Sequence, residues 1–213
     1  MLDSTCKILD VLENMFSLNV DGSDSSIKLL PAMNIKKLER LGPDPLFTVS
    51  SQLTGEMKGS LTLLMNPTDF KQLGEVLKPT LKLLFLSNPD ADLSTLKNHL
   101  PEWMEDDEQS NSNDSVFFEQ MMDASKELGN MIFGIYTDAI YKVFDLHTQH
   151  SMPEFSGNTQ QQTIHEVLTS QNLLDKQHFL IENEFTDLHR NFGFLCLISP
   201  SRKSLKVMLE RVG

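Results

Sequence analysis

The stretch Asp123-Ala-Ser-Lys-Glu-Leu-Gly-Asn-Met-Ile-Phe-Gly134 lies inside a long segment whose apolar spacing predicts a helix. Because successive residues turn by about 100° around a helix axis, steps of three and four residues return to one side. Three polar residues and a glycine therefore share a stripe about 60° wide, namely Asp123, Glu127, Asn130 and Gly134. The apolar residues form a broad face about a third of a turn away, made of Ala124, Leu128, Met131, Ile132, Ile135, Ala139 and Val143.

This polar line predicts a surface that works with another molecule. A carboxylate, a carboxamide and a glycine offer a charged anchor, a hydrogen-bonding head and room for close approach. The side chains are too few for self-contained hydrolysis. They would suit an enzyme whose substrate supplies the rest of the site.

Outward from this helix, the N-terminal half has the patterns of a helix, a hairpin and a second, short helix. Residues 4–20 have helical apolar spacing, while residues 26–30, 46–53 and 60–65 are typical of strands. Gly55 and Gly59 bracket the hairpin turn, and Asn66-Pro67 ends the last strand. A short helix over residues 68–77 follows, with Thr68 or Asp69 as its cap.

The C-terminal half repeats this order, with strands over 178–185 and 192–198, a turn near 187–191 and a helix over 201–211. Leu53-Thr54 matches Phe185-Thr186, and Asn66-Pro67 matches Ser199-Pro200, at an offset of 132 or 133 residues. A single hairpin with one helix is too small to be stable alone, so both halves are expected to share one sheet.

The predicted fold is therefore α+β, a pseudo-twofold duplication in which two long helices pack on an antiparallel sheet. The chain would be one domain of two half-repeats, about 1–86 and 116–213, joined by an acidic polar linker over about 87–115. A short helix over 96–104 could bury Trp103 within that linker. Weak order is expected in the linker and in a second stretch, 149–162.

Composition narrows the classes of partner. With 18 Lys and Arg against 30 Asp and Glu, the net charge of 18 − 30 = −12 argues against nucleic acid and anionic lipid as partners and favours a basic partner.

No apolar run in the sequence approaches the roughly 18 residues of a membrane-spanning helix. The start of the chain lacks signal-peptide features, and only Cys6 and Cys196 are present. We expect a cytoplasmic protein with reduced thiols, and Cys196 as a small core residue.

The repeat allows the two long helices to be compared. Setting Asn14 against Asn130 places Val11 opposite Glu127 and Lys7 opposite Asp123. Only the asparagine is kept in the first half, and an apolar valine cannot anchor a basic group. The duplicated chain is therefore expected to have one working site.

The chain resembles the CheC/CheX/FliY family of bacterial chemotaxis phosphatases. Asp123, Glu127, Asn130 and Gly134 fit the family pattern of Asp or Ser, three residues, Glu, two residues, Asn, followed by a Gly. The segments 52–64 and 192–200 support the resemblance, which spans nearly the whole chain. With one retained motif, the chain is CheX-like in site number, whereas the long acidic linker departs from the compact family pattern.

The resemblance implies the CheC-like fold and a phosphatase that hydrolyses the phosphoaspartate of a CheY-like response regulator. Glu127 would pair with a lysine of the regulator, and Asn130 would position the attacking water. Asp123 would support the helix or the rim of the interface, and Gly134 would permit close approach. The chain would need no cofactor or metal of its own, because magnesium and a lysine already lie in the regulator. The resemblance also leaves room for a homodimer.

Other readings of the same residues remain open. The stripe could be an ordinary solvated helix face, and Gly129 and Gly134 could serve helix packing or access. The chain could be a non-catalytic adaptor or motor-switch module that binds a receiver domain, or a small-ligand sensor, for which no motif is recognisable. His147-Thr-Gln-His150 has a spacing that could bind a metal, but no cysteine or acidic cluster completes such a site.

Overall fold

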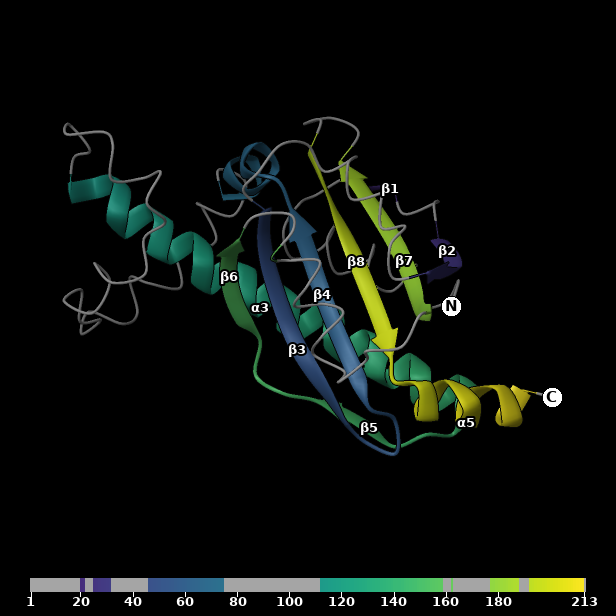
Figure 1. Cartoon of the computed structure of the whole chain (residues 1–213). Helices are drawn as coiled ribbons and strands as arrows, with labels where there is room; N and C mark the ends of the chain where they lie inside the picture. The colour runs from purple at the N-terminus through teal and green to yellow at the C-terminus, as the bar shows by residue number, and fades with distance from the viewer. Residues whose placement is uncertain are drawn as a thin grey trace.

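One antiparallel sheet with a long helix across its face organises the part of the chain that the computed structural model describes (Figure 1). That part comprises residues 20–21, 25–31, 46–74, 112–158, 162, 177–187 and 192–212. The predicted α+β class with an antiparallel sheet is confirmed. The predicted first helix over 4–20, apart from its last residue, and the helix over 96–104 with Trp103 lie outside the described residues.

The sheet has the strand order β1-β7-β8-β4-β3-β5, with β2 also paired to β7 and β6 also paired to β3. All of these pairings are antiparallel. The strands are β1 Val20–Asp21, β2 Ser25–Pro31, β3 Leu46–Gly55, β4 Gly59–Met65, β5 Thr148–His150, β6 Glu154–Asn158, β7 Gln177–Asp187 and β8 Phe192–Pro200. The five strands predicted from the sequence thus lie within β2, β3, β4, β7 and β8.

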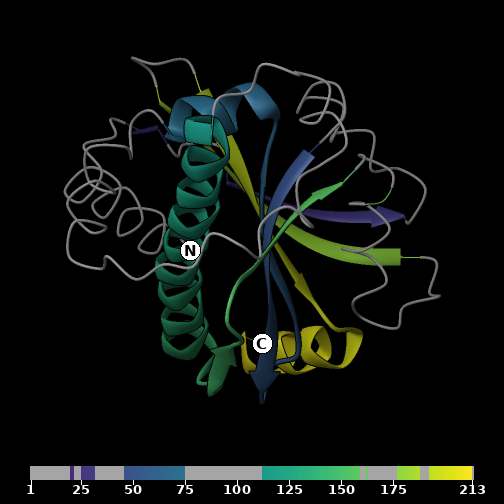
Figure 2. The same ribbon diagram turned by 90° about the vertical axis from the view of Figure 1, so that its left-hand side faces the viewer.

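Helices lie along one face of this sheet and at opposite ends of its strands within the described residues. The helix α3, Ser112–Phe144, lies along one face of the sheet (Figure 2). Residues 67–74 form a helix at the end of β4, and α5, Arg202–Val212, follows β8 at the opposite end of the strands (Figure 1). Because α3 begins at Ser112, it takes in the last residues of the stretch predicted as linker.

The core lies between α3 and the sheet. Four phenylalanines from four different elements meet there, with ring centroids 4.4 to 6.2 Å apart, namely Phe47, Phe70, Phe118 and Phe155. Aromatic rings bury large apolar areas and prefer such offset contacts. This cluster fixes the helix 67–74, α3 and β6 against β3.

The two central strands, β4 and β8, pair from Gly59↔Pro200 to Leu64↔Leu195. An offset of 133 residues maps Leu63 onto Cys196, and these two residues face each other in the ladder. The hairpins β3–β4 and β7–β8 therefore flank a common centre, as a twofold arrangement requires. The duplication itself, and the division into half-repeats, stay predictions because the first long helix is outside the described residues.

The prediction of weak order over 149–162 is wrong for residues 149–158. The backbone of this segment pairs with the edge of β3, through Leu53↔His150 in β5 and Val49↔Phe155 in β6. The Thr48 and Ser156 hydroxyls hydrogen-bond at 2.6 Å. Edge strands leave backbone groups unpaired, so a polar segment with Pro153 and Gly157 becomes ordered once it can bond to β3.

The cap predicted for the helix after β4 is also wrong. Asn66 caps this helix, because its Oδ1 accepts a hydrogen bond from the Asp69 backbone N–H at 2.8 Å. Pro67 takes the first helical position, where its missing N–H has no consequence. The Asp69 carboxylate instead accepts from the Gly193 backbone N–H at 3.2 Å. Burial raises the pKa of Asp69, while that hydrogen bond opposes the rise.

The turn from β3 to β4 uses its glycines as predicted, for two different reasons. Gly55 has φ of 102°, in the left-handed region that other residues avoid. At Gly59 a Cβ would overlap the carbonyl oxygen of Ser199 in β8. The turn also binds the segment after α3, since the His147 backbone N–H donates to Glu56 Oε2 at 2.7 Å.

Cys196 lies in the middle of β8 and is fully buried, as predicted for a small core residue. Burial raises the pKa of its thiol to about 12, and the neighbouring Tyr136 hydroxyl partly opposes this rise. Burial likewise raises the pKa of the Tyr136 hydroxyl far above its usual value. Both groups are therefore neutral at any physiological pH.

None of the described helices has an apolar stretch long enough to cross a membrane.

We predict that Cys196 is inert toward thiol reagents in the folded protein, because the reactive species is the thiolate. In a Cys6→Ser variant, a disulfide reagent at pH 8 should label Cys196 only as fast as the protein unfolds. Labelling in denaturant serves as the positive control. Rapid stoichiometric labelling under native conditions would show that β8 is not buried as described.

Candidate functional site

The helix α3 presents its polar stripe on the side opposite to the core. Leu128, Ile132 and Phe133 are fully buried on the inner side, while Asp123 and Glu127 are exposed and Asn130 is half-buried. The buried face is rotated relative to the predicted one. Val143, predicted to face the core, is 52% exposed, and Phe133 and Ile140 are buried instead. The cause is the segment that follows α3, which packs on the Phe133 side of the helix.

The two carboxylates predicted for the site have different surroundings. Asp123 forms an ion pair with Lys126, with Oδ1 and Nζ 3.0 Å apart. Glu127 forms no ion pair or hydrogen bond with any described residue. A solvated pair one helical turn apart contributes little to stability. Its effect here is to neutralise one carboxylate and leave the next one able to bind a cation.

Glu119 extends the acidic line by one helical turn before Asp123, and the sequence interpretation missed it. Partial burial raises the pKa of Glu119, the charge of Asp123 raises it further, and Lys126 opposes both. The interaction shows that Glu119 and Asp123 lie close enough to repel each other. The spacing of four residues was the available signal, since positions i and i+4 are neighbours on a helix.

Asn130 is the only carboxamide of the predicted stripe. It is half-buried, and its side chain makes no hydrogen bond to any described residue. A carboxamide can accept a hydrogen bond with its oxygen while its nitrogen donates two. Asn130 can therefore hold a water molecule at the surface of α3.

The two glycines of the motif have different roles. A Cβ at Gly129 would lie 2.6 Å from Val49 Cγ1, so this glycine lets α3 approach β3 closely. A Cβ at Gly134 would meet only His150 Nε2, at 3.9 Å, which is ordinary contact. Packing thus explains Gly129. Because Gly134 has no side chain, another molecule can approach the helix closely beside Asn130.

His150 is a second residue that the site prediction did not include. It lies in β5 against α3, with its ring centroid 6.0 Å from that of Phe133. Its Nδ1 is 2.9 Å from the Ser151 carbonyl oxygen, which can only accept, so Nδ1 carries the hydrogen. In the neutral ring Nε2 then has a lone pair directed toward Gly134. The sequence suggested His147 and His150 only as a metal-binding pair, but the His147 ring lies 4.7 Å from that of Tyr141 instead.

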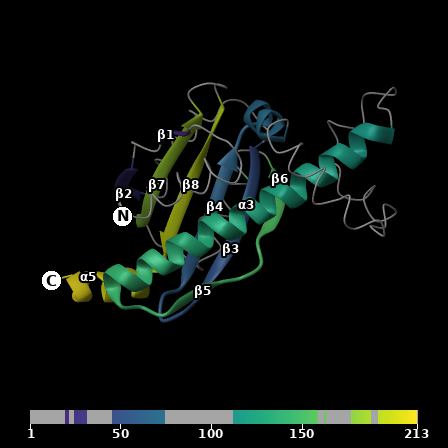
Figure 3. The same ribbon diagram turned by 180° about the vertical axis from the view of Figure 1, so that it is seen from behind.

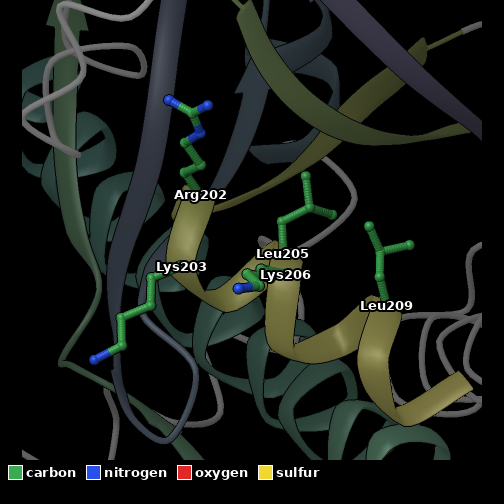
Figure 4. A pocket seen from close by; sticks show the side chains of 5 residues that line it. All are labelled: Arg202, Lys203, Leu205, Lys206 and Leu209. Carbon is green, nitrogen blue, oxygen red and sulfur yellow. The ribbon is translucent and has the colours of Figure 1, made fainter.

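The described residues hold no group of three or more side chains that could bind a metal ion. A hollow on α5 is lined by Arg202, Lys203, Leu205, Lys206 and Leu209 (Figure 4). All five belong to a single helix, and Figure 4 shows Lys203 directed away from the two leucines. No polar groups converge there, so the α3 stripe is the better candidate for a functional site.

Comparison with solved structures finds the same fold in FliY, CheX and FliM. FliY from Thermotoga maritima matches with a TM-score of 0.60 and 12% identity, over 98% of this chain and 89% of that one. A chain of the CheX–CheY–BeF3–Mg2+ complex from Borrelia burgdorferi matches with a TM-score of 0.52 and 13% identity, over 94% and 95%. The FliM middle domain from H. pylori matches with a TM-score of 0.54 and 10% identity, over 98% and 91%.

At these identities the likeness shows the fold, and it confirms the fold that the sequence resemblance implied. No protein-family model and no curated protein sequence matches the chain. The first-half counterparts Lys7, Val11 and Asn14 lie outside the described residues, so the single-site interpretation stays a prediction.

We predict that Gly129→Ala and Gly134→Ala have opposite consequences for stability. Both replacements gain the same helix propensity, up to about 1 kcal/mol. Only the Gly129 methyl group must displace Val49, and such overpacking costs about 1–3 kcal/mol. Gly129→Ala should therefore have the lower free energy of unfolding in urea. Equal stabilities would contradict the close approach of α3 to β3.

Proposed function

We propose that the protein is a cytoplasmic phosphatase that hydrolyses the phosphoaspartate of a CheY-like response regulator. The observation that carries this proposal is that the Glu127 carboxylate and the Asn130 carboxamide lie one turn apart on the outer face of α3, and neither side chain has a partner among the described residues. The fold is shared with a solved complex of CheX with CheY. Regulators of this class would bring the phosphoryl group, magnesium and a catalytic lysine of their own.

Glu127 is proposed to dock the regulator through its lysine. Lys126 pairs with Asp123 rather than with Glu127, so the Glu127 carboxylate is available to an incoming cation. Glu119 and Asp123 add negative charge to the same line, and the net charge of the chain is −12. A field of one sign speeds the approach of an oppositely charged surface. Asp123 then belongs to the rim of the interface.

Asn130 is proposed to enter the regulator's active site and position the attacking water. Hydrolysis of an acyl phosphate needs a water in line with the bond that breaks and neutralisation of the phosphoryl oxygens. Magnesium and lysine of the regulator would provide the neutralisation. The phosphatase then needs to contribute only geometry, which Asn130 can supply with one accepted and one donated hydrogen bond.

A non-catalytic adaptor is the second candidate, because the fold is shared equally with the middle domain of FliM. Such a module would bind a receiver domain through the same acidic face without hydrolysing anything. Glu127 alone would suffice for that role. Asn130 distinguishes the two candidates, since only a phosphatase requires a group that holds water.

We predict that Asn130→Ala lowers the rate of phosphate loss from a phosphorylated cognate receiver by about 10²-fold or more. Binding of the receiver should change little, because the anchor is intact. The measurement is phosphate release at saturating receiver with magnesium, beside receiver affinity. Full activity in Asn130→Ala would refute the mechanism, and binding without hydrolysis by the wild type would favour the adaptor.

We predict that Glu127→Ala weakens receiver binding by about tenfold and flattens its dependence on salt, with the maximal rate largely kept. Glu210→Ala, an exposed carboxylate of α5, is the matched control and should behave as the wild type. The measurement is the affinity for the receiver at salt concentrations from about 50 to about 300 mM, a range over which charge screening changes strongly. A loss shared by both variants would indicate unspecific charge steering.

A further inference from the structure

The segment from β5 to β6 runs beside α3 in the opposite direction (Figure 3). Three pairs of rings fix its course, at centroid distances of 4.7, 6.0 and 6.2 Å, namely Tyr141 with His147, Phe133 with His150 and Phe118 with Phe155. The segment therefore forms a wall along the side of the helix on which Phe133 lies.

Backbone geometry places the loop between the two strands, Ser151–Pro153, at about the level of Asn130. His150 Nε2 lies beside Gly134. From Gly134 to Asn130 a helix advances about 6 Å, at 1.5 Å per residue. An extended chain covers that distance in about two residues, at 3.3 Å each, which leads from His150 to Met152.

The backbone on both sides of Met152 is firmly held. Ser151 N–H donates to the Gln52 carbonyl oxygen at 2.9 Å, and the Ser51 hydroxyl donates to the Ser151 carbonyl oxygen at 2.7 Å. Pro153 is buried, and Glu154 begins the pairing of β6 with β3. The Met152 side chain is nevertheless 84% exposed, more than any other large apolar residue among those described.

A lone exposed apolar residue usually needs no explanation. Met152 differs because it projects from an ordered loop that this geometry places level with Asn130, the carboxamide of the stripe. Methionine is unbranched and polarisable, so it adapts to a partner's surface at little cost. Together, Glu127, Asn130 and Met152 form a surface with an acidic anchor, a polar centre and an apolar flank.

We propose that the receiver domain covers the β5–β6 loop as well as α3, with Met152 as the apolar anchor of the interface. The partner surface would therefore carry an apolar patch beside its phosphorylated pocket and a basic group on the far side, facing Glu127. In the neutral ring, His150 Nε2 would offer a hydrogen-bond acceptor at the end of this surface. This inference rests on the proposed function, because it names the second half of the same docking surface.

The test is receiver affinity for wild type, Met152→Ala and Met152→Asp. Leu209→Asp is the matched control, because Leu209 is also apolar and 65% exposed but lies on α5. Met152→Asp should raise the Kd at least tenfold and Met152→Ala several-fold. The rate of phosphate loss at saturating receiver should stay unchanged, and thermal melts should show that all variants fold.

The outcomes separate this inference from the proposed function. If both Met152 variants bind as tightly as the wild type while hydrolysis depends on Asn130, the receiver does not cover the loop, although the proposed function stands. If Leu209→Asp alone weakens binding, the receiver docks on α5 and the inference is overturned. If the wild type binds no phosphorylated receiver, both fail. If it binds without hydrolysis and Met152→Asp releases the receiver, the docking surface holds for an adaptor.

Discussion

The close approach of α3 to β3 at Gly129 is the contact on which the rest of the structure depends. A side chain at this position would meet Val49, which is itself fully buried. Glycine within a helix costs about 1 kcal/mol of stability relative to alanine. Here the close packing of α3 against β3 offsets that cost. Because this contact acts together with the packing of Phe133 against His150, it helps to fix the rotation of α3 that turns Asp123, Glu127 and Asn130 away from the core.

The candidate site is built from α3 and from the β5–β6 segment that packs beside it. Lys126 pairs with Asp123, and Glu127 has no partner among the described residues, so one carboxylate of the stripe is neutralised while the next can bind a cation. The β5–β6 segment closes one side of the stripe and adds His150 and Met152 at fixed positions. A surface of this kind can recognise and orient a partner, while the reactive groups stay in that partner.

Local signals predicted those elements whose own residues determine them. Apolar alternation located β3, β4, β7 and β8, and helical spacing located α3, because these periodicities depend on neighbours in the chain. The predictions failed where contacts with residues far away in the chain determine the local structure. Asp69 looked like a cap but bonds to Gly193, 124 residues away, while Asn66 caps the helix. Residues 149–158 looked weakly ordered because their partner is the edge of β3, about 100 residues earlier in the chain.

The sequence by itself determined the polar stripe of Asp123, Glu127, Asn130 and Gly134, since helical geometry places those positions on one side. It also determined the antiparallel hairpins and the buried character of Cys196. Only the tertiary structure decided which carboxylate is already paired, which glycine packs and which stays open, and which loop lies beside Asn130. These properties depend on contacts between segments far apart in the chain, whose distances no local pattern records.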